Sequence, residues 1–349
     1  LMEKIKRDSN RVDISKLQAD EISDDDLTGG YILKFDHNTG DNLGGFESKK
    51  GSLYKYHYPK ADAIVSEQEI YIQDYVDSLE SMIAGDSIND ANSGYMSLLN
   101  LESFIDFFIL QEFSKNVDAY RLSTFIYKDK NSIDLRLNAG PIWDINHGYG
   151  NCNYVETAEL GSGCWEVEEF IVDYWIGWGL NPSTAFWWKT LWTDETFQVL
   201  FLNRYNELRQ STLSDENIHG IIDSLSNYIG NSVNKNFNRW RILDTYVWPN
   251  YYIFNSHSEE IQYLKQWINR RLAWIDQQYY LSTKNSMIFR KYIITKAFPN
   301  PFNSEITIQY TLLKNSNVNV VVYDMMGRLV KNLYGNQQNA GFQSIQWNA

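Results

Sequence analysis

Two stretches decide the fold: Asn116-Val-Asp-Ala-Tyr-Arg-Leu-Ser123 and Gly140-Pro-Ile-Trp-Asp-Ile-Asn146. The pair of aspartates that they hold is the most informative feature of the chain. Each stretch holds one aspartate, Asp118 or Asp144, beside other side chains that offer oxygen or amide groups to a metal. Two carboxylates held near one another suit metal-assisted phosphoryl transfer, in which one positions a hydroxyl nucleophile and the other holds Mg²⁺. The pattern therefore indicates an enzyme.

The residues between the two aspartates favour a β-hairpin. Ser123-Thr-Phe-Ile-Tyr127 is typical of a strand, Lys128-Asp-Lys-Asn-Ser132 is a polar turn, and Ile133-Asp-Leu-Arg-Leu137 alternates apolar and charged residues. Such a hairpin predicts that Asp118 and Asp144 lie close together at one end of a two-stranded ribbon.

Composition excludes several classes of protein. Hydrophobic residues make up 43% of the 349 positions, with 12 Trp and 24 Tyr, which supplies ample material for a core and excludes disorder. The formal net charge is −13, so a nucleic acid is not expected as a partner. No run of residues is long and apolar enough to predict a transmembrane segment.

The two cysteines leave two readings open. Cys152 and Cys164 flank a short loop, where a surface disulfide in an exported protein and a pair of buried thiols are both compatible with the spacing. They lack the spacing of a zinc site. Leu1 opens in mid-pattern, so we expect the chain to be a fragment.

Short strands and one long helix are predicted before the aspartates. Strand patterns cover 29–35 and 52–58, and Ser66-Glu-Gln-Glu69 reads as a capping box that begins a helix. This helix should reach about Ile83, ahead of Gly85. Its apolar face is expected to hold Ile70, Tyr71, Tyr75, Leu79 and Ile83.

The fold class predicted for the whole chain is α+β. A nearly all-apolar helix over 101–115 should be buried and should deliver the Asp118 loop, so a core element would support the site. Further helices are expected at 186–192, 199–210, 218–229 and 259–280, rich in Trp that we assign mainly to core packing. Short strands at 306–310, 318–323 and 343–347 predict a small β-sandwich, with a domain boundary near 290.

The segment from Asn116 to Asn151 closely resembles the CotH (spore coat protein H) kinase family. The Asn-x-Asp-x-Tyr-Arg-x-Ser stretch, the hairpin and the Gly-Pro-x-Trp-Asp-x-Asn stretch follow the family's order, and segments 1–13 and 29–34 also look like family segments. The resemblance covers about residues 1–280. It implies an atypical, reduced kinase-like domain over 1–285, mainly the helical C-lobe, that transfers phosphate from ATP to Ser or Thr hydroxyls of extracytoplasmic proteins.

The resemblance also implies roles for individual residues. Asp118 matches the catalytic aspartate that orients or deprotonates the acceptor hydroxyl, and Asp144 matches the aspartate that binds Mg²⁺ or Mn²⁺. Ser123 falls where typical kinases carry a metal-binding Asn; a hydroxyl is a weaker ligand, and Asn146 is a candidate to compensate. Glu3 resembles the hinge segment that contacts adenine.

Three other polar features have two readings each, and a fourth has one. Arg121 is a candidate to meet the phosphate of the cofactor ATP, or to pair with a neighbouring carboxylate. His147 is a candidate for phosphate or metal contact, or for a local hydrogen bond, and the local bond is favoured. Asp24-Asp-Asp26 is expected to begin a helix or form a solvated turn, and the glutamates at 166–169 to line a solvated surface.

If Leu1 lies at the hinge, the lobe with the phosphate-covering strands and phosphate-pairing Lys is not in this chain. We therefore expect this chain alone to bind ATP poorly. Two alternatives to a secreted kinase stay open: a catalytically weak kinase-like surface scaffold or adhesion protein, favoured by Ser123, and a carbohydrate-binding or glycan-active surface protein, suggested by the Trp and Tyr content.

The end of the chain resembles the carboxy-terminal sorting domain of the type IX secretion system. Ala297-Phe-Pro-Asn-Pro-Phe-Asn303, the stretch from Val320 to Val330 and the strand from Gly341 to Trp347 carry the resemblance. It implies a sorting β-sandwich over 291–349, truncated before its final strands. It also implies contact with the type IX machinery and export across the outer membrane to the cell surface or medium.

Overall fold

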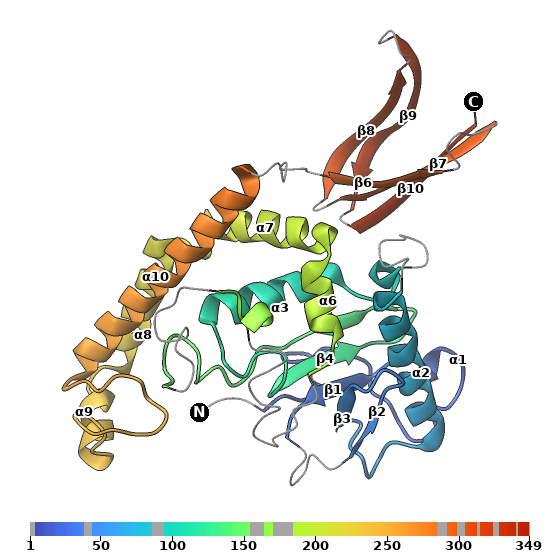
Figure 1. The fold of residues 1–349 in the computed structure, drawn as a ribbon. Helices are drawn as coiled ribbons and strands as arrows, with labels where there is room; N and C mark the ends of the chain where they lie inside the picture. The colour runs from blue at the N-terminus through green and yellow to red at the C-terminus, as the bar shows by residue number, and fades with distance from the viewer. Residues whose placement is uncertain are drawn as a thin grey trace.

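The computed structural model describes residues 4–37, 44–85, 94–153, 164–169, 184–284, 292–298, 304–312, 315–323, 328–339 and 341–348. In this part of the chain a mixed domain of helices and one sheet is followed by a pair of small sheets (Figure 1). The α+β class predicted from the sequence is confirmed.

The sheet of the first domain has five strands in the order β2-β3-β1-β4-β5. They are β1 (Tyr31–Phe35), β2 (Gly45–Glu47), β3 (Leu53–Tyr58), β4 (Thr124–Lys128) and β5 (Leu137–Ala139), and every neighbouring pair is antiparallel. The two strands predicted before the aspartates are confirmed as β1 and β3.

The predicted hairpin is present, but its second strand was placed wrongly. Strand β5 begins only at Leu137, whereas Ile133 and Leu135 are 65% and 45% exposed. Residues between the strands instead turn around the buried ammonium of Lys128, which donates a hydrogen bond to the side-chain oxygen of Asn131 at 2.7 Å. Ser132 also donates to Asp25, 107 residues away, from its N–H and from its hydroxyl, and these polar contacts outweigh the alternating pattern.

Helix α2 (Ser66–Ile83) confirms the predicted span and most of the predicted apolar face, but not its cap or the placement of Ile70. Val65 is the N-cap residue, and its N–H donates to the Gln68 side chain at 3.3 Å, so the expected Ser66–Glu69 capping box is wrong. Ile70 is 59% exposed. The fully buried apolar side chains are Ile72, Val76, Leu79 and Ile83.

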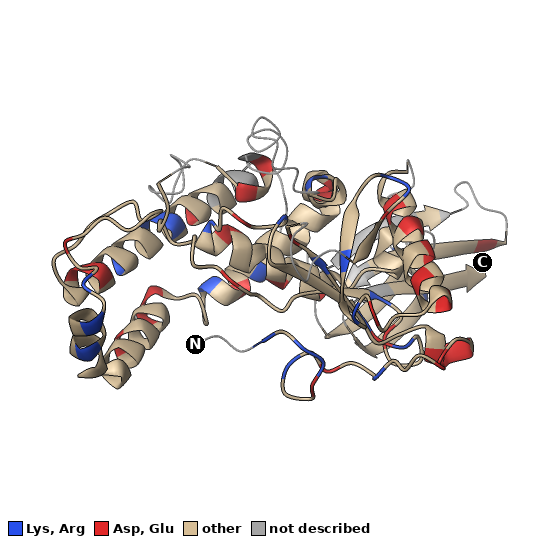
Figure 2. Cartoon of the chain, turned by 90° about the horizontal axis from the view of Figure 1, so that it is seen from below, with Lys and Arg blue, Asp and Glu red and all other residues tan. Residues whose placement is uncertain are grey.

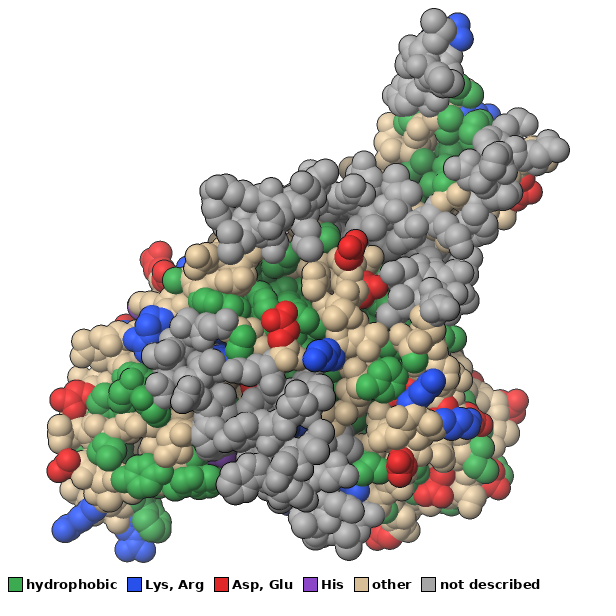
Figure 3. Space-filling view, in the orientation of Figure 1, with side chains coloured by type: hydrophobic (Ala, Val, Ile, Leu, Met, Phe, Trp, Pro, Cys, Tyr) green, Lys and Arg blue, Asp and Glu red, His purple; other side chains and the backbone are tan. Residues whose placement is uncertain are grey.

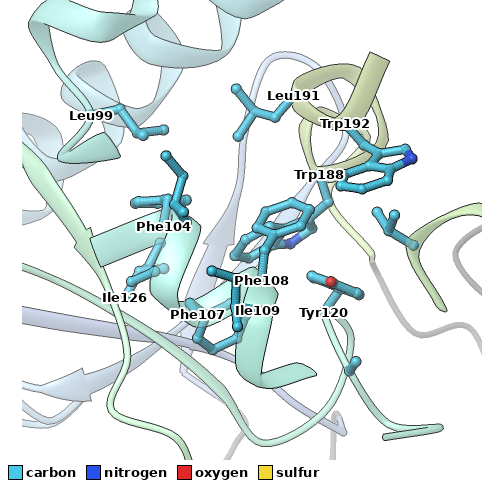
Figure 4. Packing of buried hydrophobic residues seen from close by; sticks show 14 of the residues in the cluster. Leu99, Phe104, Phe107, Phe108, Ile109, Tyr120, Ile126, Trp188, Leu191 and Trp192 are labelled. Carbon is cyan, nitrogen blue, oxygen red and sulfur yellow. The ribbon is translucent and has the colours of Figure 1, made fainter. Parts of the chain in front are cut away.

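Helix α3 (Leu101–Ser114) runs through the core, as predicted. Figure 4 shows Phe104, Phe107 and Phe108 packed against Trp188 and Tyr120. Phe107 and Trp188 stack with ring centroids 5.4 Å apart. Because α3 is held on several sides, the loop that follows it starts from a rigid position.

Some of the remaining helices contact α3 directly, and others lie away from it. They are α1 (Asp24–Leu27), η2 (Tyr95–Ser97), α5 (Glu166–Glu169), α6 (Trp187–Thr193), α7 (Glu195–Arg209), α8 (Asp215–Ile229), α9 (Ser232–Arg239) and α10 (His257–Lys284). Helix α9 was not predicted. Asp24-Asp-Asp26 opens α1, as expected.

The two faces of the sheet bury different partners. Tyr31, Leu33 and Phe35 of β1 face the main core with the helices, whereas Ile32 packs with the amino-terminal segment around Val12. Strand residues alternate between faces, so one strand serves both layers. The site loops therefore leave a sheet that is covered on both sides.

The tail forms two antiparallel sheets beyond the end of α10 (Figure 1). One has the order β10-β7-β6 and the other pairs β8 with β9. The strands are β6 (Tyr292–Phe298), β7 (Glu305–Leu312), β8 (Ser316–Tyr323), β9 (Leu329–Gln338) and β10 (Gly341–Asn348). β7, β8 and β10 match the three predicted strands; β6 and β9 were not predicted.

Candidate active site

The loop that carries Asp118 begins where α3 ends. Lys115 caps the helix in the left-handed conformation, with φ 45°, and Tyr120 and Ser123 in the same loop have φ 66° and 48°. Asp144 on the second loop has φ 59°. Left-handed backbone at non-glycine residues is costly and gathers at functional sites, so the strain points to these two loops.

Both carboxylate oxygens of Asp118 have cationic neighbours. Arg121 lies on one side, with Nη2 2.5 Å from Oδ1, and His147 on the other, with Nδ1 3.0 Å from Oδ2. The Arg121 side chain is only 4% exposed and also donates to the backbone oxygen of Val117. Asp118 is thus held in one orientation from two directions.

Asp144 lies in a second polar group with Ser123 and Asn146. The Ser123 hydroxyl donates to Oδ2 of Asp144 at 3.4 Å. One polar atom of the Asn146 amide is 2.6 Å from Oδ1 of Asp144 and 3.2 Å from its backbone oxygen, and the other is 3.3 Å from Nε2 of His147. His147 therefore joins the two groups, because its ring nitrogens face Asp118 and Asn146.

The hydrogen bond to Asp118 raises the pKa of His147 above its ordinary value. The imidazole consequently keeps both protons over a wider pH range, and in that form it can donate from both nitrogens. The sequence favoured a local hydrogen bond for His147, but the partner in the structure is Asp118, 29 residues away on the other loop. Its importance was not visible from the sequence.

The second loop is clamped between two helices. The backbone N–H of Tyr149 donates to the oxygen of Ser114 at the end of α3, at 2.7 Å. Gly150 has φ +75°, and a Cβ there would lie 2.4 Å from the indole of Trp267 on α10. Only glycine fits this close approach, which keeps the loop next to α3.

A buried ionic cluster supports the Asp118 loop from beneath. Oε1 of Glu112 accepts from the hydroxyl of Tyr120 at 2.8 Å, and Oε2 lies 3.3 Å from Nη2 of Arg271. Arg271 also donates from Nε to the backbone oxygen of Glu112 at 2.7 Å. Both charged side chains are fully buried, so α10 anchors the end of α3 and the loop beyond it.

Lys115 and Glu166 form the other half of this cluster. Nζ of Lys115 lies 3.1 Å from Oε2 of Glu166, and neither side chain is exposed. Burial raises the pKa of Glu166 to about 7. The expectation that Glu166 lines a solvated surface was wrong, because Glu112 accepts the backbone N–H groups of Glu166 and Val167 and draws α5 inward.

The structure brings together most of the residues predicted for the site. Asp118, Arg121, Ser123, Asp144 and Asn146 form one continuous polar group through His147. Glu3 lies outside the described residues. Sequence reasoning missed the supporting roles of Glu112, Glu166 and Arg271; the one available signal was Glu112, a charged residue near the end of a largely apolar helix.

The donor set around Asp144 fits a divalent cation. In the orientation that satisfies both ends of its amide, Asn146 donates to Asp144 and accepts from Nε2 of His147. Turning the amide over would bring its oxygen to two oxygens of Asp144, an arrangement that a hard cation prefers. Within the described ranges, no group of three or more His, Cys, Asp or Glu forms a metal cluster. Mg²⁺ sites commonly use one or two carboxylates plus substrate phosphates, and Asp144 could supply such a carboxylate.

Cys152 and Cys164 are thiols, and no disulfide joins them. Cys152 is buried, and the sulfur of Cys164 accepts from Nζ of Lys115 at 3.4 Å. Of the two readings left open by the spacing, the structure therefore agrees with two thiols, of which Cys152 is buried and Cys164 is half-buried.

The part of the chain that carries these two loops matches a known family. The CotH kinase protein family model matches residues 1–275, so the chain belongs to the CotH family. A secretion system C-terminal sorting domain matches residues 296–348. Comparisons with curated proteins and with solved structures found no match.

The sorting domain directs type IX export to the cell surface or the medium. The protein is thus an exported CotH-family protein. Among the helices that the structure describes, none has both the length and the apolar character of a membrane span.

Proposed function

We propose that this chain carries the phosphotransfer site of a secreted, metal-dependent atypical protein kinase. Its reaction is the transfer of the γ-phosphoryl group of ATP to a Ser or Thr hydroxyl of an extracytoplasmic protein. The observation that carries the proposal is the unbroken chain of polar contacts Arg121–Asp118–His147–Asn146–Asp144–Ser123. It joins a residue suited to an acceptor hydroxyl with residues suited to a metal–phosphate group.

Asp118 receives and orients the acceptor hydroxyl. As the hydroxyl oxygen bonds to phosphorus and the bond to ADP breaks, the hydroxyl proton passes to Asp118. Arg121 and His147 hold the carboxylate in place, so little reorganisation is required during the reaction. Because Arg121 is already engaged by Asp118, its contribution to ATP is a charge near the phosphates.

Asp144, Asn146 and Ser123 would hold Mg²⁺ or Mn²⁺. When bound, the cation neutralises phosphate charge and aligns the γ-phosphoryl group. Ser123 is the weakest of the three ligands, and its hydroxyl is 3.4 Å from Asp144. Glu3 is proposed to contact adenine from the hinge segment.

The test is phosphate transfer by the full-length protein. The protein is incubated with labelled ATP and Mn²⁺ beside the variants Asp118→Asn and Asp144→Asn. We expect both variants to lose transfer, and only Asp144→Asn to lose metal-dependent nucleotide binding. Equal label transfer in all three proteins would sink the kinase proposal.

A second candidate is a kinase-like surface scaffold without catalysis. Ser123, in place of an amide ligand, is the observation that favours it. A folded full-length protein that binds no nucleotide in the same experiment would support the scaffold.

A further inference from the structure

The part of the chain from α8 to the start of α10 exposes an unusual amount of apolar surface. Eighteen large hydrophobic side chains are exposed in the described ranges, and eleven of them lie between Ile221 and Ile253. Tyr228 is 90% exposed, Trp248 67% and Trp240 60%. We call the exposed side chains of residues 221–253 the α8–α9 surface. Apolar patches this dense mark interaction sites.

Helices α8 and α9 carry more apolar side chains than they bury against the core. Ile218 is the one buried residue of α8, and Ile222 packs partly against the core, while Ile221 and Leu225 face outward four residues apart. Helix α9 has no buried residue. In Figure 3, green side chains gather over α8 and α9 at the lower left.

The same surface is basic, although the chain is acidic. Lys235, Arg239 and Arg241 are all exposed on this surface against the two acidic residues Asp223 and Asp244, so the surface has a net charge of +1 (3 − 2) while the whole chain carries −13. Arg239 lies over the ring of Trp240, 5.4 Å from its centroid. Figure 2 shows these basic residues at α9, at the end opposite the acidic helix α1.

The α8–α9 surface reaches the candidate active site. The ring of Trp248 meets that of His147 edge-to-face, with centroids 6.5 Å apart. The hydroxyl of Tyr246 accepts from the Asn153 side chain at 2.8 Å, which ties the segment to the end of the Asp144 loop. A ligand on this surface would therefore lie beside Asp118.

We propose that the α8–α9 surface binds the acceptor segment of the protein substrate, and that this segment carries apolar and acidic residues around its Ser or Thr. The proposal rests on the proposed kinase function for the identity of the site. Exposed Ile and Leu favour a polypeptide over a glycan, because sugars stack on aromatic rings and gain little from aliphatic side chains. The basic residues select acidic partners.

Peptide binding tests the proposal without requiring catalysis. The probe is a fluorescein-labelled 14-residue peptide, a length of about four helical turns, with one Ser flanked by Leu, Phe, Asp and Glu. Matched peptides replace Asp and Glu by Lys, or Leu and Phe by Ala, and cellohexaose is the glycan probe. Affinity for the full chain is measured by fluorescence anisotropy at low and high salt.

Two variants of the surface and one control complete the design. Arg239→Glu/Arg241→Glu reverses the charge, and Trp240→Ala/Trp248→Ala removes apolar area; all four residues are exposed, so the fold should persist. Lys50→Glu, an exposed change outside the surface, is the control. We expect each double variant to weaken the acidic peptide at least about tenfold, and the control to leave it unchanged.

Several results would overturn the proposal. The first is that the lysine peptide binds as tightly as the acidic peptide, and the second is that only cellohexaose binds. The third is that no peptide binds. The fourth is that the chain forms dimers that Trp240→Ala/Trp248→Ala converts to monomers. Peptide binding without phosphate transfer would keep the docking surface and reject the kinase. If both double variants transferred phosphate at the rate of the unmodified protein, the kinase proposal would stand and the docking surface would be rejected.

Discussion

His147 links the two halves of the candidate site, since Nδ1 lies 3.0 Å from Oδ2 of Asp118 and Nε2 lies 3.3 Å from the Asn146 amide. A single imidazole thus sets the position of the expected acceptor-binding carboxylate relative to the expected metal ligands. If the site is catalytic, His147 acts as a positioning residue.

His147→Ala should lower kcat for phosphate transfer by about 100-fold, because Asp118 loses one of its two fixed neighbours and misplacement by 1 Å has effects of this size. The KM for ATP should change little. His147→Gln should recover part of the rate, since an amide can donate to the carboxylate. Steady-state kinetics with labelled ATP provide the measurement.

The matched control is His219→Ala. His219 lies on α8 and contacts the Asn269 side chain at 2.9 Å, away from Asp118. A similar rate loss in both alanine variants would show that His147 has no special role.

Ser123→Asn should strengthen metal binding. An amide oxygen is a better ligand than a hydroxyl, and Asn accepts the left-handed backbone of position 123 more readily than Ser. We expect Mn²⁺ to bind about fivefold more tightly in the presence of a non-hydrolysable ATP analogue, the equivalent of one added polar contact. Isothermal titration calorimetry measures the change.

Ser123→Ala serves as the comparison, because it keeps a short side chain and removes the oxygen. Its Mn²⁺ affinity should fall below that of the unmodified protein. If Asn and Ala at position 123 gave the same affinity, this residue would not be a ligand.

Glu112→Leu should destabilise the domain by about 3–5 kcal/mol, because the guanidinium of Arg271 would stay buried without its carboxylate. The double variant Glu112→Leu/Arg271→Met should be more stable than Glu112→Leu alone. Urea unfolding followed by tryptophan fluorescence gives both free energies. Additive losses would mean that the pair is not coupled.

Glu166 should make the free energy of unfolding depend on pH. Burial raises its pKa from 4.5 to about 7, so the folded protein binds this proton more tightly than the unfolded chain. The stabilisation that the protonated Glu166 gives to the folded state is fully present below pH 4.5 and is lost as pH rises through 7. The shift corresponds to roughly 3 kcal/mol.

Unfolding at pH 4.5 and pH 8 of the unmodified protein and of Glu166→Gln checks this dependence. The glutamine cannot titrate, so the advantage of the unmodified protein over the variant should shrink as pH rises. A constant difference between the two proteins would show that Glu166 titrates near its ordinary value.

Local sequence patterns predicted much of the fold. The spans of α2 and α3 and the positions of β1, β3 and β4 followed from periodicity, which local spacing determines. The strand expected at 133–137 failed because Asn131 turns back to Lys128, a contact that alternation cannot reveal. Ile70 was assigned to the wrong side of α2 for a related reason: apolar character does not show which stripe meets the core.

For the candidate site, the sequence predicted the polar residues that lie together in the structure, but not the buried residues that support them. Asp118 and Asp144 stand in recognisable motifs, and the hairpin between them indicated that they would meet. The partners Glu112 and Arg271 come from helices far apart in the chain, and no pattern joins them. Glu166 looked solvated because it stands in an acidic run, yet its burial depends on Lys115.

The contact between Glu112 and Arg271 also determines when the site can form during synthesis. The two residues are 159 positions apart, so a growing chain holds both aspartates long before α10 leaves the ribosome. Until then Glu112 has no guanidinium partner, and the loop of Asp118 lacks its anchor. A nascent protein of this kind would stay inert towards the proteins of the compartment in which it is made.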